Sequence, residues 1–173
     1  REKEALLKEV HHRVKNNLQV ITSLLRLEAA RSRQEESRSV LRDMQSRIRS
    51  MALLHETLYQ TGNFAGVNLA DYLERLSGQL LRAQQRGATA AHLVTDLSPV
   101  NLGIDQAIPC GLIVNELLTN SLKHAFPGGA KGEVRIALRN LGERQVEIEV
   151  SDNGVGLPGD FEAKVNPYLR PLY

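Results

Sequence analysis

Two adjacent histidines lie beside two adjacent asparagines in 9-EVHHRVKNNLQV-20, a stretch that otherwise has the pattern of an amphipathic helix. On a helical wheel, His11 flanks the apolar stripe and His12 falls at the position most exposed to solvent. Asn16 lies one turn from His12 on the same face, and Lys15 lies three residues on. An asparagine amide can fix the tautomer of an imidazole and leave its other nitrogen as a nucleophile. His12 is therefore a candidate phosphoryl acceptor, and an idle surface histidine is the alternative.

A second set of polar residues occurs in 115-NELLTNSLKHAF-126, within an otherwise apolar stretch. Glu116 and Asn120 are four residues apart and share one face of a predicted helix. An amide oxygen on that face can bind Mg²⁺, a hard cation that favours oxygen ligands. The alternative is an ordinary polar helix face.

Another candidate site is 151-SDNGVGLP-158, in which Asp152 follows a predicted strand. A carboxylate at a strand end can accept a hydrogen bond from the exocyclic amine of adenine. Gly154 and Gly156 would let the backbone pass close to the base. An ordinary Asp-Asn-Gly turn is the alternative.

The elements that position these residues fall into two parts. All 13 Gly and 6 Pro occur at or after Gly62, which predicts a boundary there. Before it, two apolar series have the three-four spacing of amphipathic helices, and the polar stretch 31–39 is the predicted turn between them. The first series is Leu7, Val10, Val14, Leu18, Ile21 and Leu25, and the second is Leu41, Met44, Ile48, Met51, Leu54 and Leu58. His55 replaces an apolar residue in the second stripe and is predicted to be a packed, structural histidine.

Two helices with one apolar stripe each bury little on their own, so we expect a homodimer that forms a four-helix bundle. After the boundary, helices are predicted over 68–85 and 105–126, and strands over 89–97, 133–140 and 145–152. A short turn through Gly142 joins the last two strands. The predicted domains are a helical hairpin, 1–61, and an α+β layered domain, 62–173, with helices on one face of a mixed sheet.

Composition excludes several classes of protein. A net charge of +2 gives no general case for a nucleic-acid partner. The arginine cluster is interleaved with acidic residues and is interpreted as a solvated helix face; it comprises Arg31, Arg33, Arg38, Arg42, Arg47 and Arg49. The single cysteine, Cys110, permits no intrachain disulfide and is compatible with a cytoplasmic protein. No run approaches the ~20 apolar residues of a membrane span. The chain opens inside a helical pattern, so we expect an upstream segment.

The run 9-EVHHRVKNNLQVITSLLRL-27 closely resembles the phosphoacceptor box of sensor histidine kinases, in the subfamily with an H-R-V-K-N-N box that is sister to the HWE type. No tryptophan is present, and the W-x-E signature of the HWE class is therefore absent. Residues 115–126 resemble the N box, and 151–158 the first glycine box, of the ATPase fold shared by histidine kinases, gyrases and heat-shock chaperones. The resemblance covers residues 1 to 160.

The resemblance implies ATP and Mg²⁺ as cofactors and His12 as the acceptor, since the accepting histidine directly precedes the arginine. Asn120 matches the metal-binding asparagine, Glu116 a residue that orients or activates the attacking group, and Lys123 and His124 residues near the nucleotide phosphates. Asp152, Gly154 and Gly156 match the adenine-binding box. The phosphoryl group would pass to an aspartate of a response regulator, and the missing upstream segment would be a sensor.

The chain departs from the family after Gly156. No second G-x-G follows, and 161-FEAKVNPYLRPLY-173 does not resemble a lid over the nucleotide, since two prolines prevent a long helix. The ATPase domain is therefore expected to be truncated. Two alternatives remain: a non-catalytic dimeric scaffold or phosphotransfer protein with a degenerate ATPase domain, and a Ser/Thr kinase or another ATPase of the same fold.

Overall fold

The computed structural model describes residues 2–61, 66–84, 90–142 and 145–156. The predicted boundary at Gly62 and the predicted absence of a lid at the end of the chain lie outside these residues. The fold confirms a helical hairpin followed by a layered domain that contains both helices and a sheet.

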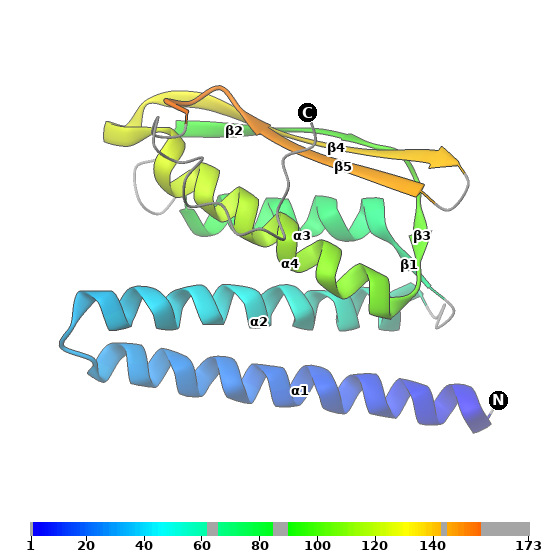
Figure 1. Ribbon diagram of the computed structural model, residues 1–173. Helices are drawn as coiled ribbons and strands as arrows, with labels where there is room; N and C mark the ends of the chain where they lie inside the picture. Colours follow the sequence, from blue (N-terminus) through cyan, green and yellow to red (C-terminus); the bar gives the residue numbers. More distant parts are fainter. Residues whose placement is uncertain (1, 62–65, 85–89, 143–144, 157–173) are drawn as a thin grey trace.

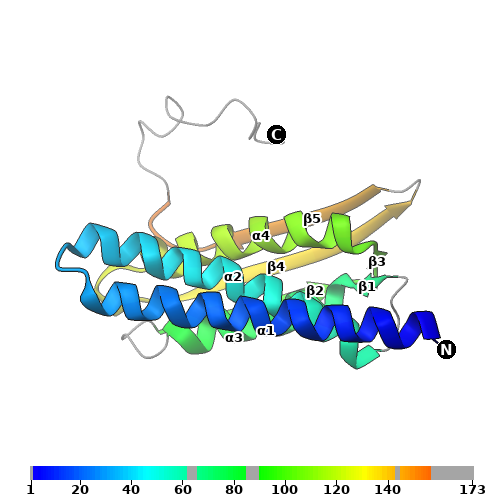
Figure 2. The ribbon, with the colours of Figure 1, turned by 90° about the horizontal axis from the view of Figure 1, so that it is seen from below.

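The hairpin consists of α1 (Glu2–Arg31) and α2 (Glu35–Thr61), which run antiparallel and side by side (Figures 1 and 2). The connection takes only residues 32–34 and is shorter than the predicted turn at 31–39. The guanidinium of Arg38 donates a hydrogen bond of 2.8 Å to the carbonyl of Ser32 and so fixes the start of α2 against the turn.

The second part carries a three-stranded sheet in the order β2-β4-β5, formed by β2 (Ala90–Leu97), β4 (Lys131–Gly142) and β5 (Gln145–Asp152). β2 and β4 are parallel, whereas β4 and β5 are antiparallel, so the predicted mixed sheet is confirmed. Helices α3 (Leu69–Gln84) and α4 (Ile104–Asn120) lie on one face of the sheet; α2 packs below them, and α1 is the outermost layer (Figure 1).

The hydrophobic core extends from the sheet through α3 and α4 to α2. Leu53 and Leu54 of α2 are buried in the same cluster as the apolar residues of the layered domain. Tyr72 of α3 is buried, and its hydroxyl donates a hydrogen bond of 3.0 Å to the carbonyl of Ser50 on α2. Gly111 of α4 provides the room, because a Cβ there would lie 2.2 Å from the Tyr72 hydroxyl. The C-terminal half of α2 is therefore packed against the layered domain.

Two local features differ from the sequence prediction. The short strands β1 (Val67–Asn68) and β3 (Asn101–Leu102) pair antiparallel, and two residues each are too few to show an alternating pattern. The α-helix predicted over 105–126 ends at Asn120 and continues as a π-helical turn, Ser121–Ala125, before a 3-10 turn, Pro127–Gly129. Single π turns within helices are frequent at functional sites.

Among the described helices, none combines the length and the apolar composition needed to cross a bilayer. Cys110 is partly buried against the core, and burial raises the pKa of its thiol.

Candidate functional site

The candidate acceptor lies on the outer helix. His12 is exposed on α1, and its Nδ1 lies 3.4 Å from the side-chain nitrogen of Asn16, one helical turn away. The neighbouring Arg13 is held by Glu9 at 2.8 Å and is exposed. The expected exposure of His12 and the expected proximity of Asn16 are both found.

His11 and His55 form a pair on the seam between α1 and α2. Their Nδ1 atoms are 3.0 Å apart and their ring centroids 5.3 Å apart. Burial, and then the nearby His11, lower the pKa of His55. His11 is half-buried, as its position beside the apolar stripe predicts, and the predicted packing of His55 in the seam is confirmed. Lys15 also contacts α2, since its ammonium lies 3.1 Å from the carboxylate of Glu56.

Glu116 faces the hairpin from α4. Both of its carboxylate oxygens accept hydrogen bonds from Arg47 of α2, at 2.7 and 2.9 Å. The hydrogen bond and the charge of Glu116 raise the pKa of Arg47. Arg47 is nevertheless 51% exposed, and Arg31, Arg33 and Arg49 are exposed as well, so these residues form the solvated helix face that was predicted. The pairing of Arg47 with Glu116 was not predicted. Asn115, the buried residue that precedes Glu116, accepts a 3.0 Å hydrogen bond from the hydroxyl of Ser46 on α2.

Asn120 is exposed at the last residue of α4, and Lys123 and His124 lie in the π-helical turn that follows. Lys123 forms an ion pair with Asp43 of α2. We call the contacts of Asp43, Ser46 and Arg47 with α4 and its π turn the α2–α4 contact. This contact engages two of the predicted site residues, Glu116 and Lys123, with the hairpin.

Asp152 ends β5 and faces the end of α4. Its Oδ2 accepts a 2.7 Å hydrogen bond from the hydroxyl of Ser121, and its Oδ1 accepts one of 3.0 Å from the backbone of Gly154. The backbone N–H of Val155 donates to the carbonyl of Ala125 at 2.9 Å. A Cβ at Gly154 would lie 2.3 Å from that carbonyl oxygen, so only glycine allows this approach.

The chemistry of this end of the domain suits an adenine nucleotide. A carboxylate at a strand end, a close glycine backbone, an exposed amide at Asn120 and the cation of Lys123 are grouped around the end of α4. Gly156, with φ of +76°, continues the glycine segment. Among the described residues, no three His, Cys, Asp or Glu side chains form a metal-binding group. Asn120, the predicted magnesium ligand, is an amide and is not one of these residue types.

The structure does not bring the two sets of residues together. The acceptor end of α1 contacts α2 at His55 and Glu56, whereas α4 and its π turn contact α2 at Asp43 to Arg47. These positions are 8 to 13 residues apart, or about 12–20 Å along the helix axis at ~1.5 Å per residue. His12 and the α4 end therefore lie at different levels of the hairpin.

Sequence reasoning missed Ser121, Ser46 and Arg47. Ser121 lies beside Asn120, but its contact with Asp152 joins residues 31 positions apart. The Arg47–Glu116 contact joins residues 69 positions apart. Their residue types carry no signal of these partners. The partner of Ser121 is set by the approach of β5 to the end of α4, and the partners of Ser46 and Arg47 are set by the packing of α2 on α4.

Comparison with known proteins identifies both parts of the chain. A histidine kinase family model matches residues 9–84, and the model of the histidine kinase-, DNA gyrase B- and HSP90-like ATPase matches residues 105–168. The chain is therefore a histidine kinase catalytic core, composed of these two domains.

The sensor histidine kinase PdtaS of Mycobacterium tuberculosis is 34% identical over 171 residues, which are 96% of this chain and 33% of the relative. Blue-light-activated histidine kinase 2 of Erythrobacter litoralis is 30% identical over 160 residues, covering 90% of this chain and 45% of the relative. A solved structure of an Erythrobacter litoralis blue-light activated histidine kinase has a TM-score of 0.65 and 29% identity, and covers 90% of this chain and 46% of that one. The chain thus spans between a third and a half of the length of these proteins.

Proposed function

We propose that the chain autophosphorylates on His12 with Mg-ATP as the donor and passes the phosphoryl group to an aspartate of a response regulator. The observation that carries this proposal is the exposed His12 with Asn16 one turn away, in a chain whose other half is an ATPase domain. The names of the similar proteins, sensor and blue-light-activated histidine kinases, support it.

Asn16 would set the tautomer of His12. The two ends of an asparagine amide have nearly the same shape, so its oxygen can occupy the position 3.4 Å from Nδ1 and accept the Nδ1–H. The lone pair then resides on Nε2, which faces away from that contact. Nε2 forms the bond to phosphorus while the bond to the leaving diphosphate breaks.

Residues at the end of α4 would hold the nucleotide. We assign Asp152 to the adenine amine, Gly154 and Gly156 to close backbone contact with the base, and Lys123 and His124 to the phosphates. Asn120 would be the protein ligand of Mg²⁺, which neutralises phosphate charge when bound. Glu116 would orient or activate the attacking imidazole.

The arrangement described here would then be a resting state. Glu116 binds Arg47 and Lys123 binds Asp43, and neither lies at the level of His12. Phosphorylation of His12 requires the α4 end to leave this contact and move along the hairpin, toward its own His12 or that of a partner. The packing of Tyr72 against Ser50, in the middle of α2, would serve as the pivot.

The hairpin would form a homodimer through an exposed apolar stripe. Several large apolar side chains of α1 and α2 are more than two-fifths exposed: Leu6, Val10, Val20, Ile21, Leu24, Leu27, Val40 and Met44. Such a stripe is what a four-helix bundle of two hairpins would bury. Replacing Leu24 and Leu27 by glutamate should convert a dimer into a monomer in analytical ultracentrifugation, whereas glutamate at exposed Arg31 and Arg33 should not.

The deciding experiment is incubation of the chain with Mg-ATP labelled on its γ-phosphate, alongside His12→Gln and His11→Gln. We expect an acid-labile label on the parent chain and on the His11 variant, and none on the His12 variant. Label retained by His12→Gln would refute the choice of acceptor. Absence of label from all three proteins would refute autophosphorylation by this chain and favour the phosphotransfer-protein alternative. Incubation with another histidine kinase that carries the labelled phosphoryl group would then test that alternative.

A further inference from the structure

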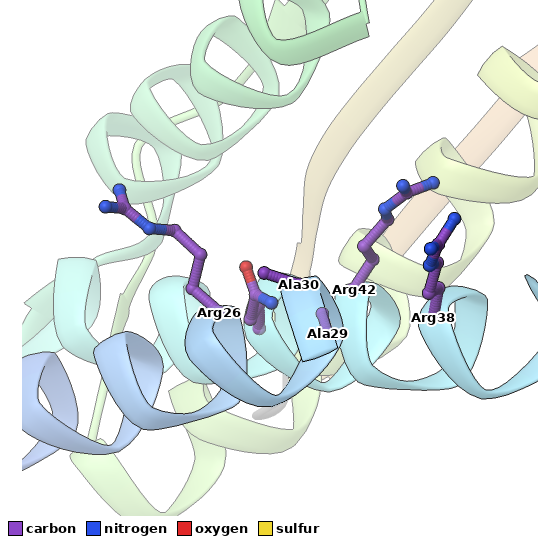
Figure 3. Close-up of a pocket in the computed structure, with 6 residues that line it drawn as sticks. Arg26, Ala29, Ala30, Arg38 and Arg42 are labelled. Carbon is purple, nitrogen blue, oxygen red and sulfur yellow. The ribbon is translucent and has the colours of Figure 1, made fainter. Parts of the chain in front are cut away.

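A hollow of about 300 Å³ lies between the end of α1 and the start of α2, near the tip of the hairpin. Figure 3 shows Arg26 on one side and Arg38 and Arg42 on the other, with Ala29 and Ala30 between them. The sixth lining residue is Gln45. None of them comes from α4 or β5, so this hollow is separate from the candidate nucleotide site.

The charge around the hollow is positive. Arg38 and Arg42 share a single carboxylate, Glu35, at 3.2 and 3.5 Å, and all three groups are substantially exposed. Exposed ion pairs of this kind are weak. Among the residues that the structure describes, Arg26 has neither an ion pair nor a hydrogen bond. The three guanidinium cations are therefore balanced by a single carboxylate, that of Glu35.

Gln45 adds a neutral polar group to the lining of the hollow. It is 7% exposed, and its side-chain amide makes no hydrogen bond within the described residues. Its amide atoms are open to the hollow, since Thr119 Oγ1 is the one enclosed side-chain polar atom without a hydrogen-bond partner in the part of the chain that the structure describes. A ligand in the hollow can therefore contact this amide directly. An amide N–H donor beside three arginines is suited to an anionic oxygen.

The two alanines leave the space between the arginines open. A hollow of about 300 Å³ is at the lower end of the range for small-molecule sites. Guanidinium groups bind phosphate oxygens in pairs, with a geometry that a carboxylate or phosphate matches and a halide does not.

At ~100° per residue, the hollow and the exposed apolar stripe lie on opposite sides of the α1–α2 seam, so a dimer formed through the stripe leaves the hollow open.

From these observations we propose that the hollow at the hairpin tip binds a small phosphomonoester. Arg26 and Arg42 hold the phosphate oxygens from the two helices, Gln45 donates a hydrogen bond from the floor, and the ligand links α1 to α2. Neither the ATPase domain nor His12 takes part, so this proposal is independent of the kinase activity proposed above.

Calorimetric titration of the chain with glycerol 3-phosphate tests the proposal, with glycerol and sodium chloride as matched probes. The variants are Arg26→Gln and Arg42→Gln, which remove charge but keep length. Arg49→Gln is the control, because Arg49 is exposed on the same helix outside the hollow. Circular dichroism verifies that each variant is folded.

We expect saturable binding of glycerol 3-phosphate, at least tenfold weaker in either hollow variant and unchanged in Arg49→Gln, with no saturable heat from glycerol or chloride. A Gln45→Met variant should also bind more weakly. Equal loss of affinity in Arg49→Gln, or binding of chloride as strong as that of the phosphomonoester, would indicate general attraction of anions to a basic helix and overturn the proposal. The absence of saturable binding would overturn it as well.

Discussion

The acceptor surface and the end of α4 are built from contacts of different range. Asn16 lies four residues from His12, so their proximity follows from helical geometry alone. At the end of α4, Asp152 meets a residue 31 positions away, and the hairpin residues that meet Glu116 and Lys123 are 69 and 80 positions away. A local site survives any rearrangement of domains, whereas a site made of distant contacts can be assembled and dismantled.

The largest effect is expected from a change at the tightest of the distant contacts. Gly154→Ala places a Cβ 2.3 Å from the carbonyl oxygen of Ala125, which forces the glycine segment away from the π turn. Overpacking of this kind costs about 1–3 kcal/mol. We expect nucleotide binding to weaken by about 5- to 150-fold, at 1.4 kcal/mol per tenfold, in titrations with a fluorescent ATP analogue.

The matched control is Gly78→Ala in α3, where the added Cβ meets only the flexible Arg82 side chain at 3.4 Å. This variant should bind nucleotide as the parent does and unfold with about 0.5–1 kcal/mol more free energy, as alanine replaces glycine within a helix. Unchanged binding by Gly154→Ala would mean that the glycine segment does not hold the base.

The second test separates the two regions by releasing the α2–α4 contact. Asp43→Ala with Arg47→Ala removes the hairpin partners of Lys123 and Glu116 but leaves both residues in place. Exposed ion pairs contribute roughly 0.2–1 kcal/mol each. If the contact restrains a resting state, the initial rate of His12 labelling should rise by about two- to thirtyfold, at ~1.4 kcal/mol per tenfold.

Arg49 is an exposed arginine two residues after Arg47 on α2, and Arg49→Ala should leave the labelling rate unchanged. A slower reaction in the Asp43 and Arg47 double variant would contradict the resting state, because it would mean that the contact positions the ATPase domain for catalysis.

The third test addresses the local site. Asn16→Ala removes the side chain that fixes the tautomer of His12 but leaves the exposed imidazole. A hydrogen bond of 3.4 Å at the surface is at the weak end of the usual net contribution, about 0.5 kcal/mol. We expect the rate of labelling to fall about two- to threefold, with unchanged nucleotide affinity. Asn17→Ala is the control, since Asn17 makes no hydrogen bond among the described residues. An equal fall in the labelling rate of Asn17→Ala would mean that Asn16 does not set the tautomer of His12.

The same difference in range explains what the sequence could predict. The hairpin, the exposure of His12 and the packing of His55 followed from residue spacing, and the long helices and strands followed from apolar periodicity. The pairing of Glu116 with Arg47 did not, because Arg47 and Arg49 are both exposed arginines of α2 and nothing in their residue type distinguishes them. The π turn at Ser121–Ala125 was also missed; the carbonyl of its Ala125 accepts a hydrogen bond from the backbone of Val155, which lies 30 positions away.

The smallest expected effect concerns the seam beneath the acceptor. Burial and the nearby His11 lower the pKa of His55 in the folded chain, so the unfolded chain binds more protons in the range between the two pKa values. The stability contributed by neutral His55 is complete above the unfolded pKa of about 6.5. It is lost as the pH falls from there toward the folded pKa. The midpoint of urea unfolding should therefore be lower at pH 5.5 than at pH 7.5.

His55→Gln should narrow that difference in the unfolding midpoint between the two pH values. Titrating groups away from the seam contribute equally to both proteins, so the comparison isolates the seam. A difference that persists in full in His55→Gln would mean that the histidine pair is not the source. Since His55 joins α2 to the helix that carries His12, a pH-dependent seam would make even the local site depend on a contact that spans 44 positions.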